Sequence, residues 1–195
     1  VKRIQKTGNV HQHLDLIAGL PYENYERFAQ SFRDVYALHP EQLQLGFLKV
    51  LKGSYMHEKT RDYELLYQDR PPFEVLSTRW LSYDDVIRLK GVEEMVEVYY
   101  NSGQFVNTLR LLEEEFTDTF VLYENLSRYY EENGLHMMNH SRITRYEVLF
   151  AFIKEHVEKD VENYRQMLIL DLYLRENVKK RPEFAGEINI EKWEA

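Results

Sequence analysis

The polar side chains best placed for chemistry lie in one short stretch near the start of the chain. His11, His13 and Asp15 alternate with other residues, so an extended strand would bring all three to one face. Two imidazoles and a carboxylate are metal-ligand chemistry, and a metal-dependent hydrolase is one interpretation. A metal site needs a further ligand from another element, and no second dense cluster of His and Asp lies on a predicted strand. We therefore expect no metal site.

A strand–helix–strand unit would position these side chains. Residues 10–19 alternate as a strand, apolar residues recur with helical period over residues 25–36, and residues 42–47 alternate again. The first strand has an apolar face of Leu14, Leu16 and Ala18 and an opposite face of His13, Asp15, Ile17 and Gly19. A crossover helix implies two parallel strands, with any ligand beyond their carboxyl ends, near Gly19 and Lys49.

Helical patterns dominate the remainder of the chain. Residues 51–81 are interpreted as a connector, interrupted by Pro71-Pro72 and with an extended run at residues 73–76. Ser82 and Asp85 then form a capping box at the start of the next helix. The helices expected beyond it cover residues 86–99, 105–115, 116–132, 144–156 and 159–175. The expected fold class is α+β with helices dominant, a β-α-β unit followed by a helical bundle.

Composition excludes several classes of function. The 195 residues carry a net charge of -8, which disfavours binding to nucleic acid or to an anionic membrane surface. The chain contains no cysteine, so it forms no disulfide, thiolate zinc site or cysteine-ligated iron–sulfur cluster. No apolar run approaches the roughly 20 residues of a membrane span, and we expect a cytoplasmic protein.

Several other residues are assigned to structure rather than to chemistry. His136 and His140 are four residues apart but follow Asn133-Gly134, which predicts a solvated turn. Met137-Met138 are expected to fill the core, and the adjacent tyrosines at 99–100 and 129–130 are expected to be core residues with polar tips.

The start of the chain suggests a piece of a longer protein. Residues 1–9 read like the last two turns of a helix that ends at Gly8. Two strands alone would also leave their edges unpaired, which favours self-association of the isolated chain. The tail from Lys179 to Ala195 has few apolar residues and is expected to dock loosely.

Four stretches together resemble a known enzyme family. Residues 13–21 (HLDLIAGLP), followed by Glu23 and an amphipathic helix, are similar to the late strand of radical S-adenosylmethionine enzymes, where a D-L-I-x-G-L-P signature is common. Residues 42–53 (QLQLGFLKVLKG), 71–76 (PPFEVL) and 99–103 (YYNSG) resemble the cobalamin-binding members often labelled anaerobic magnesium-protoporphyrin IX monomethyl ester oxidative cyclases. The resemblance is fainter in the C-terminal third of the chain.

Members of that family carry a cobalamin-binding domain, then a partial (β/α) barrel whose C-x-x-x-C-x-x-C loop holds a [4Fe–4S] cluster, then a helical extension. Because this chain has no cysteine, the resemblance implies that residues 1–81 are the end of the barrel with its connector and that residues 82–195 are the helical C-terminal domain. S-adenosylmethionine, the cluster, cobalamin and a small-molecule substrate are then expected in the parent protein. The isolated chain is expected to hold no cofactor and to be inactive without the missing N-terminal domains.

The resemblance also implies roles for individual residues. Asp15 would contact the ribose of S-adenosylmethionine, and Ile17 and the turn Gly19-Leu20-Pro21 would lie against its adenosyl part. A carboxylate is a good acceptor for ribose hydroxyls, although Asp15 could instead balance a cation or cap a backbone group. Gln44 and Lys49 would contact substrate or the cofactor carboxylate.

A second interpretation belongs to another functional class. The chain could be a stand-alone helical interaction or scaffold domain without catalytic activity, in which the β-α-β unit only packs. The enzyme hypothesis requires a cysteine-bearing segment elsewhere in the protein, whereas the scaffold hypothesis predicts a folded and self-sufficient chain.

Overall fold

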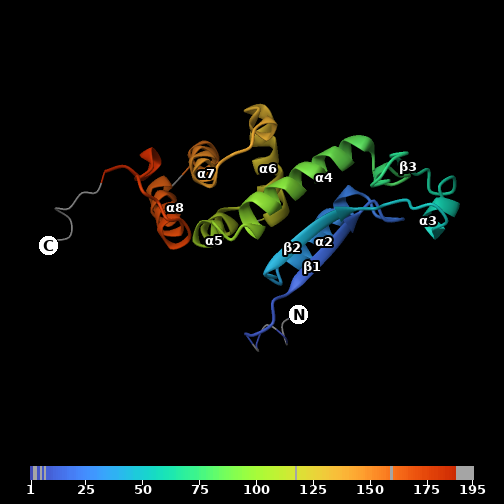
Figure 1. Ribbon diagram of the computed structural model, residues 1–195, viewed down its shortest axis with the longest axis horizontal. Coiled ribbons are helices and arrows are strands. Elements are labelled where there is room, and N and C mark those ends of the chain that lie inside the picture. Colours follow the sequence, from blue (N-terminus) through green and yellow to red (C-terminus); the bar gives the residue numbers. More distant parts are fainter. Residues whose placement is uncertain (2–3, 5, 7, 117, 159, 188–195) are drawn as a thin grey trace. The chain divides into compact units, whose positions relative to one another are not determined.

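The computed structural model describes residues 1, 4, 6, 8–116, 118–158 and 160–187 (Figure 1). Packing divides the chain into two units. The first contains Val1–Asn101 and Asp118–Arg128, and the second contains Ser102–Thr117 and Tyr129–Ala195. The division at residue 81 into a barrel end and a helical domain stays a prediction, because it rests on the family resemblance rather than on packing.

The predicted β-α-β unit is confirmed, with both strands parallel. It comprises β1 (His13–Ala18), α2 (Tyr25–Tyr36) and β2 (Gln42–Phe47), and the register places Asp15 opposite Gln44. Figure 1 shows β1 and β2 side by side, with α2 alongside them. The expected helix end at residues 1–9 falls partly outside the described residues.

Helix α2 forms where the sequence supplies both a cap and an apolar stripe. The Asn24 side chain accepts a hydrogen bond from the Arg27 N–H at 3.0 Å, which satisfies one of the orphan donors of the first turn. The residues that α2 buries are Phe28, Ala29, Phe32 and Tyr36. Their aromatic rings pack against the N-terminal half of α6 (Thr119–Glu132), where Phe120 lies 5.4 Å from Phe32 between ring centroids.

The segment between residues 51 and 81 is more structured than the predicted connector. It contains α3 (Tyr55–Glu58) and an antiparallel pair of short strands, β3 (Leu66–Tyr67) and β4 (Val75–Ser77). The extended run expected at residues 73–76 contributes to β4. Residues 73–75 also pair with the chain just after β2, so this segment continues the strand layer.

The long helix that follows begins as an α-helix and ends as a π-helix. Helix α4 (Tyr83–Met95) starts at the predicted capping box of Ser82 and Asp85 and continues into a π-helix, η1 (Val96–Asn101). Gly91 on α4 allows close approach of α6, because a Cβ at that position would lie 2.0 Å from the Ser127 hydroxyl oxygen.

The second unit is helical, as predicted. It contains α5 (Val106–Glu115), α7 (Arg142–His156), α8 (Val161–Arg175), and the 3-10 turns η2 (Leu135–Met137) and η3 (Glu183–Ala185), together with the end of α6. Its core buries Leu112, Tyr146, Leu149, Phe152 and Leu168 completely. The fold is thus α+β with helices dominant.

One assignment in this unit was wrong. Met137 and Met138 are 79% and 61% exposed rather than core residues, because η2 is a surface turn between α6 and α7. The tyrosines at 99, 129 and 130 are buried, as expected. Residues 188–195 of the tail lie outside the described residues. Over the described ranges, no helix has both the length and the apolar character needed to cross a membrane.

Candidate functional site

One face of the β1–β2 pair is exposed. Leu43 and Leu45 are buried on the inner face, whereas Asp15, Ile17 and Gln44 are exposed on the opposite face. The alternation follows from the period of two along a strand, as the sequence predicted. Ile17, on this face, is 48% exposed.

The turn after β1 depends on glycine. Gly19 has φ +88°, in the left-handed region, and a Cβ there would lie 2.8 Å from the Cγ1 atom of Val75. Only glycine therefore allows the chain to turn this closely over β4. The turn leaves Leu20 partly exposed at the carboxyl end of β1.

An open hollow of about 420 Å³ lies on this exposed face, at the carboxyl ends of the strands. Its lining residues are Asp15, Leu16, Ile17, Leu20, Gln44, Gly46, Phe47, Leu48 and Lys49. The hollow brings together Asp15, Ile17 and Leu20 from the first strand and its turn, and Gln44 and Lys49 from the second. Gly19 and Pro21 do not line it.

The lining has the composition of a small-molecule site. It carries one carboxylate (Asp15), one carboxamide (Gln44) and one ammonium (Lys49), and the other lining side chains are apolar or absent. Its volume falls within the range of about 300–1,000 Å³ that is usual for ligand pockets. The arrangement suits a ligand with hydroxyl groups, an anionic group and an apolar ring.

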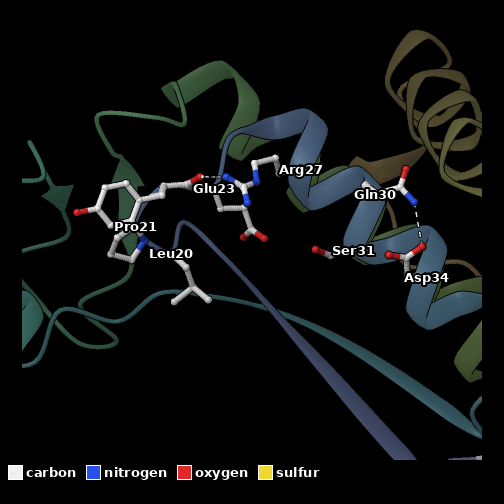
Figure 2. Close-up of a pocket in the computed structure, with 8 residues that line it drawn as sticks. Leu20, Pro21, Glu23, Arg27, Gln30, Ser31 and Asp34 are labelled. Carbon is white, nitrogen blue, oxygen red and sulfur yellow. Dashed lines mark hydrogen bonds between the residues drawn. The ribbon is translucent and has the colours of Figure 1, made fainter.

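A second hollow, of about 410 Å³, lies on the other side of the turn (Figure 2). It is lined by Leu20, Pro21, Tyr22 and Glu23 from the turn and by Arg27, Gln30, Ser31 and Asp34 from α2. Figure 2 shows the side chains of Arg27, Gln30, Ser31 and Asp34 following α2 away from the turn. Leu20 lines both hollows, so they are neighbours.

The electrostatics of the second hollow centre on Glu23. Burial raises the pKa of the Glu23 carboxyl, although the Ser31 hydroxyl and the Arg27 charge act in the opposite direction. Arg27 also donates to the Tyr22 carbonyl oxygen at 3.2 Å, which holds the guanidinium beside the turn. Sequence reasoning missed this hollow; the signal that could have found it is the polar spacing i, i+3, i+4, i+7 along one flank of α2.

Tyr22 stands at the rim in an unusual conformation. Its φ is +66°, which a non-glycine residue seldom adopts, and its side chain is 63% exposed. The ring lies 4.7 Å from Trp80 and 6.1 Å from Tyr63, between centroids. Tyr63 and Trp80, from the segment after β2, therefore pack against the ring of Tyr22.

The two histidines near β1 lie close to each other. The His11 and His13 rings lie 4.7 Å apart, edge to face. Among the described residues no group of three or more His, Cys, Asp or Glu is arranged to hold a metal ion. The metal-dependent hydrolase considered from the sequence thus lacks the further ligand that it needs in this part of the chain.

Comparison with known families assigns the chain to a class. Residues 61–195 match the family described as "Protein of unknown function (DUF4080)", and the chain belongs to that family. This domain is found in cobalamin-binding radical S-adenosylmethionine proteins. The matched region begins after β2, so Asp15 and the other residues of the first hollow precede it. No curated protein matches the chain.

Proposed function

We propose that this chain is the C-terminal part of a cobalamin-binding radical S-adenosylmethionine oxidoreductase of the oxidative-cyclase type. In that role β1 and β2 supply one wall of the site for S-adenosylmethionine, and the helices that follow cover it. The observation that carries the proposal is the first hollow, because residues from two strands and one turn line a single space at the carboxyl ends of parallel strands.

Each lining group has a defined task in this proposal. The exposed Asp15 carboxylate accepts hydrogen bonds from the ribose hydroxyls, and Ile17 and Leu20 pack against the adenosyl part. The Gly19 turn allows the chain to approach without a side chain in the way. Lys49 binds an anionic group, either the methionine carboxylate or a carboxylate of the substrate, and Gln44 donates or accepts a hydrogen bond beside Asp15.

The edge of β1 supports a larger barrel. In a parallel pair, alternate residues bond to the partner strand and the others direct their N–H and C=O groups outward. The Gln42 N–H donates to Gln12 O at 3.2 Å, and the Leu48 N–H donates to Ala18 O at 2.9 Å. In both strands, therefore, the even-numbered residues direct their backbone N–H and C=O groups toward the partner strand. The backbone groups of Asp15 and its odd-numbered neighbours in β1 therefore point to an edge that a further barrel strand can join.

This chain cannot itself hold a [4Fe–4S] cluster. Such clusters are bound by cysteine thiolates, and the 195 residues contain no cysteine. The cluster must therefore belong to another segment of the protein, and we assign no step of the radical chemistry to residues of this chain. Their part is to bind and orient S-adenosylmethionine.

The test is the affinity of the protein that joins these residues to a cysteine-bearing barrel segment. S-adenosylmethionine binding should weaken about 10- to 150-fold in Asp15→Ala, because a hydrogen bond to a charged group contributes about 1.5–3 kcal/mol. Asp34→Ala, which removes a carboxylate from the neighbouring hollow, is the matched control and should bind normally. Calorimetric titration measures both variants.

Equal affinity of Asp15→Ala and the parent would remove the ribose assignment. Absence of S-adenosylmethionine binding by the parent protein itself, with its iron–sulfur cluster present, would overturn the proposed function. That second outcome would favour the scaffold interpretation instead.

A further inference from the structure

Lys49 supplies the ammonium of the first hollow, just after the end of β2. The residue is exposed, and over the part of the chain that the structure describes its ammonium makes no hydrogen bond or ion pair. An ammonium in this state is available to an anionic ligand. A carboxylate that could occupy it nevertheless belongs to the residue directly opposite, Glu74.

Lys49 and Glu74 face each other in the short antiparallel pairing that follows β2. The backbone hydrogen bonds of this pairing are made by the residues on either side, from Val50 N to Phe73 O at 2.9 Å and from Val75 N to Leu48 O at 2.8 Å. The two residues are therefore a non-hydrogen-bonded pair, the kind in which opposite side chains lie closest. Opposite charges at such positions attract, so an ion pair between them would be the ordinary outcome.

Lys90 of α4 binds Glu74 instead. The Lys90 Nζ atom forms an ion pair with the Glu74 Oε1 atom. The side chains of Glu74 and Lys90 are 16% and 36% exposed, so water screens this pair less than it would screen a pair with the exposed Lys49. The more shielded partner therefore holds the carboxylate.

The Phe47 ring keeps Lys90 in this position. Lys90 Nζ lies 4.3 Å from the centroid of the ring, within the range of a cation–π contact. Phe47 is buried at the end of β2 and belongs to the lining of the first hollow. Burial raises the pKa of the Glu93 carboxyl, one turn further along α4, and the Lys90 charge acts in the opposite direction. Lys90 thus lies near two carboxylates, and Glu74 is the one that it bonds.

We infer that Lys90 is a positioning residue for the first hollow, which binds Glu74 and thereby leaves the Lys49 ammonium free for the carboxylate of S-adenosylmethionine. The inference rests on the proposed function, in which Lys49 binds an anionic group, and it names how that cation is kept available. Lys90 is not among the lining residues, so it acts through Lys49. Without Lys90, the Glu74 carboxylate would neutralise the ammonium, and the Asp15 carboxylate would repel an anion.

Acylation of Lys49 tests the inference, in the protein that joins this chain to a cysteine-bearing barrel segment. The reagent is an N-hydroxysuccinimide ester of acetic acid, added without S-adenosylmethionine. Acylation needs an unprotonated amine, and a carboxylate beside the ammonium favours the charged form. In Lys90→Met the released Glu74 should therefore slow acylation of Lys49 about 2- to 5-fold, the effect of an ion pair between exposed side chains. Mass spectrometry of peptides measures the rate against the exposed Lys52 as internal reference.

Three variants separate charge from packing. Lys90→Met/Glu74→Gln removes the released carboxylate and should restore the rate measured in the parent. Lys90→Arg should keep that rate, because a guanidinium also binds a carboxylate. Lys59→Met is the matched control and should leave the rate unchanged, since Lys59 likewise pairs with a carboxylate, Asp62, and lies over a ring, Tyr55.

Calorimetric titration of the same proteins with S-adenosylmethionine measures the consequence for the ligand. The affinity should fall about 2- to 5-fold in Lys90→Met, because part of the protein then holds Lys49 in an ion pair, and it should return in Lys90→Met/Glu74→Gln. In a Lys49→Met background, Lys90→Met should have no further effect, as expected for a residue that acts through Lys49.

Equal acylation of Lys49 in the parent and in Lys90→Met would overturn the inference. Slow acylation that persists in Lys90→Met/Glu74→Gln would also overturn it, because lost packing rather than the Glu74 charge would then be the cause. A changed rate with unchanged affinity would do the same, since Lys49 would not bind the carboxylate. Absence of S-adenosylmethionine binding by the parent would instead overturn the proposed function, while the acylation rates would still show whether Lys90 keeps Glu74 from Lys49.

Discussion

Asp171 is a buried acidic residue that joins two helices of the second unit. It lies on α8 with no exposed surface, and its carboxylate faces the start of α5. Oδ1 accepts from the Asn107 N–H at 3.1 Å and from Asn107 Nδ2 at 2.8 Å. Oδ2 accepts from the Thr108 N–H at 2.9 Å and from the Thr108 hydroxyl at 2.8 Å. Since Phe105 at the N-cap offers no side-chain bond, α8 caps α5 across the unit.

The magnitude of its loss follows from these four bonds. Asp171→Ala leaves the buried Thr108 N–H, the part-buried Asn107 N–H and two side-chain donors without their acceptor, and each unsatisfied buried group costs about 1–3 kcal/mol. The effects do not add fully, because the helix start can shift and water can enter. We expect the free energy of unfolding to fall by about 3–5 kcal/mol, because four neutral donors lose their acceptor and relaxation recovers part of the cost.

Urea unfolding followed by far-UV circular dichroism measures the change. Thr108→Val removes only the hydroxyl donor and should cost about 1 kcal/mol. Asp62→Ala is the control for loss of a carboxylate, because its ion pair with Lys59 is exposed and contributes little. If Asp171→Ala unfolds within about 1 kcal/mol of the parent, the carboxylate does not cap α5 in the way that the bond lengths indicate.

Two further predictions concern the turn after β1 and the ion pair between α2 and the start of α6. Gly19→Ala should lower the free energy of unfolding in urea by about 2–4 kcal/mol, because the added Cβ meets Val75 and the left-handed backbone strains alanine. Gly53 also has a left-handed backbone, with φ +79°, but no atom lies within 4 Å of an added Cβ, so Gly53→Ala should cost only about 1–2 kcal/mol. Equal costs for the two variants would refute the close approach of Gly19 to Val75. Burial alone would raise the pKa of Asp118, but the Arg33 guanidinium and nearby backbone N–H groups outweigh it and hold that pKa below its ordinary value. A carboxyl group whose pKa is lower in the folded state than its unfolded value of about 3.9 stabilises the fold above that value, and this stabilisation is lost as the pH falls through the folded pKa. Between about pH 5 and pH 2 the free energy of unfolding should therefore decrease less in Asp118→Asn than in the parent.

The sequence predicted the elements whose pattern is local. The stripe from Tyr25 to Tyr36 and the alternation of residues 42–47 match α2 and β2 residue for residue, because both elements bury one face. The bundle helices were predicted within a few residues of their bounds for the same reason. Five of the seven predicted ligand residues line one hollow, because strand parity and the parallel crossover bring them together: Asp15, Ile17, Leu20, Gln44 and Lys49.

The remaining features depend on contacts between distant residues. No local pattern distinguishes η1 from a continued α-helix, since its last residue is placed by Leu43, 58 positions earlier. The pairing of residues 73–75 with the end of β2 likewise needs the fold. Asp171 resembles an ordinary polar residue in an apolar helix until α5 is beside it. Met137 and Met138 were predicted to be buried only because their side chains are apolar, and the structure exposes both.

In the proposed function, the first hollow is one part of a larger site. Two strands form its floor, and its lining offers one carboxylate and one ammonium, with Asp15 exposed to water. A hydrogen bond made in water is worth little, because solvent competes for both partners. In the proposed function, a further barrel strand at the edge of β1 would shield Asp15 and extend the wall. If the proposed function holds, strong binding of S-adenosylmethionine requires that further strand, and the isolated chain should bind S-adenosylmethionine only weakly.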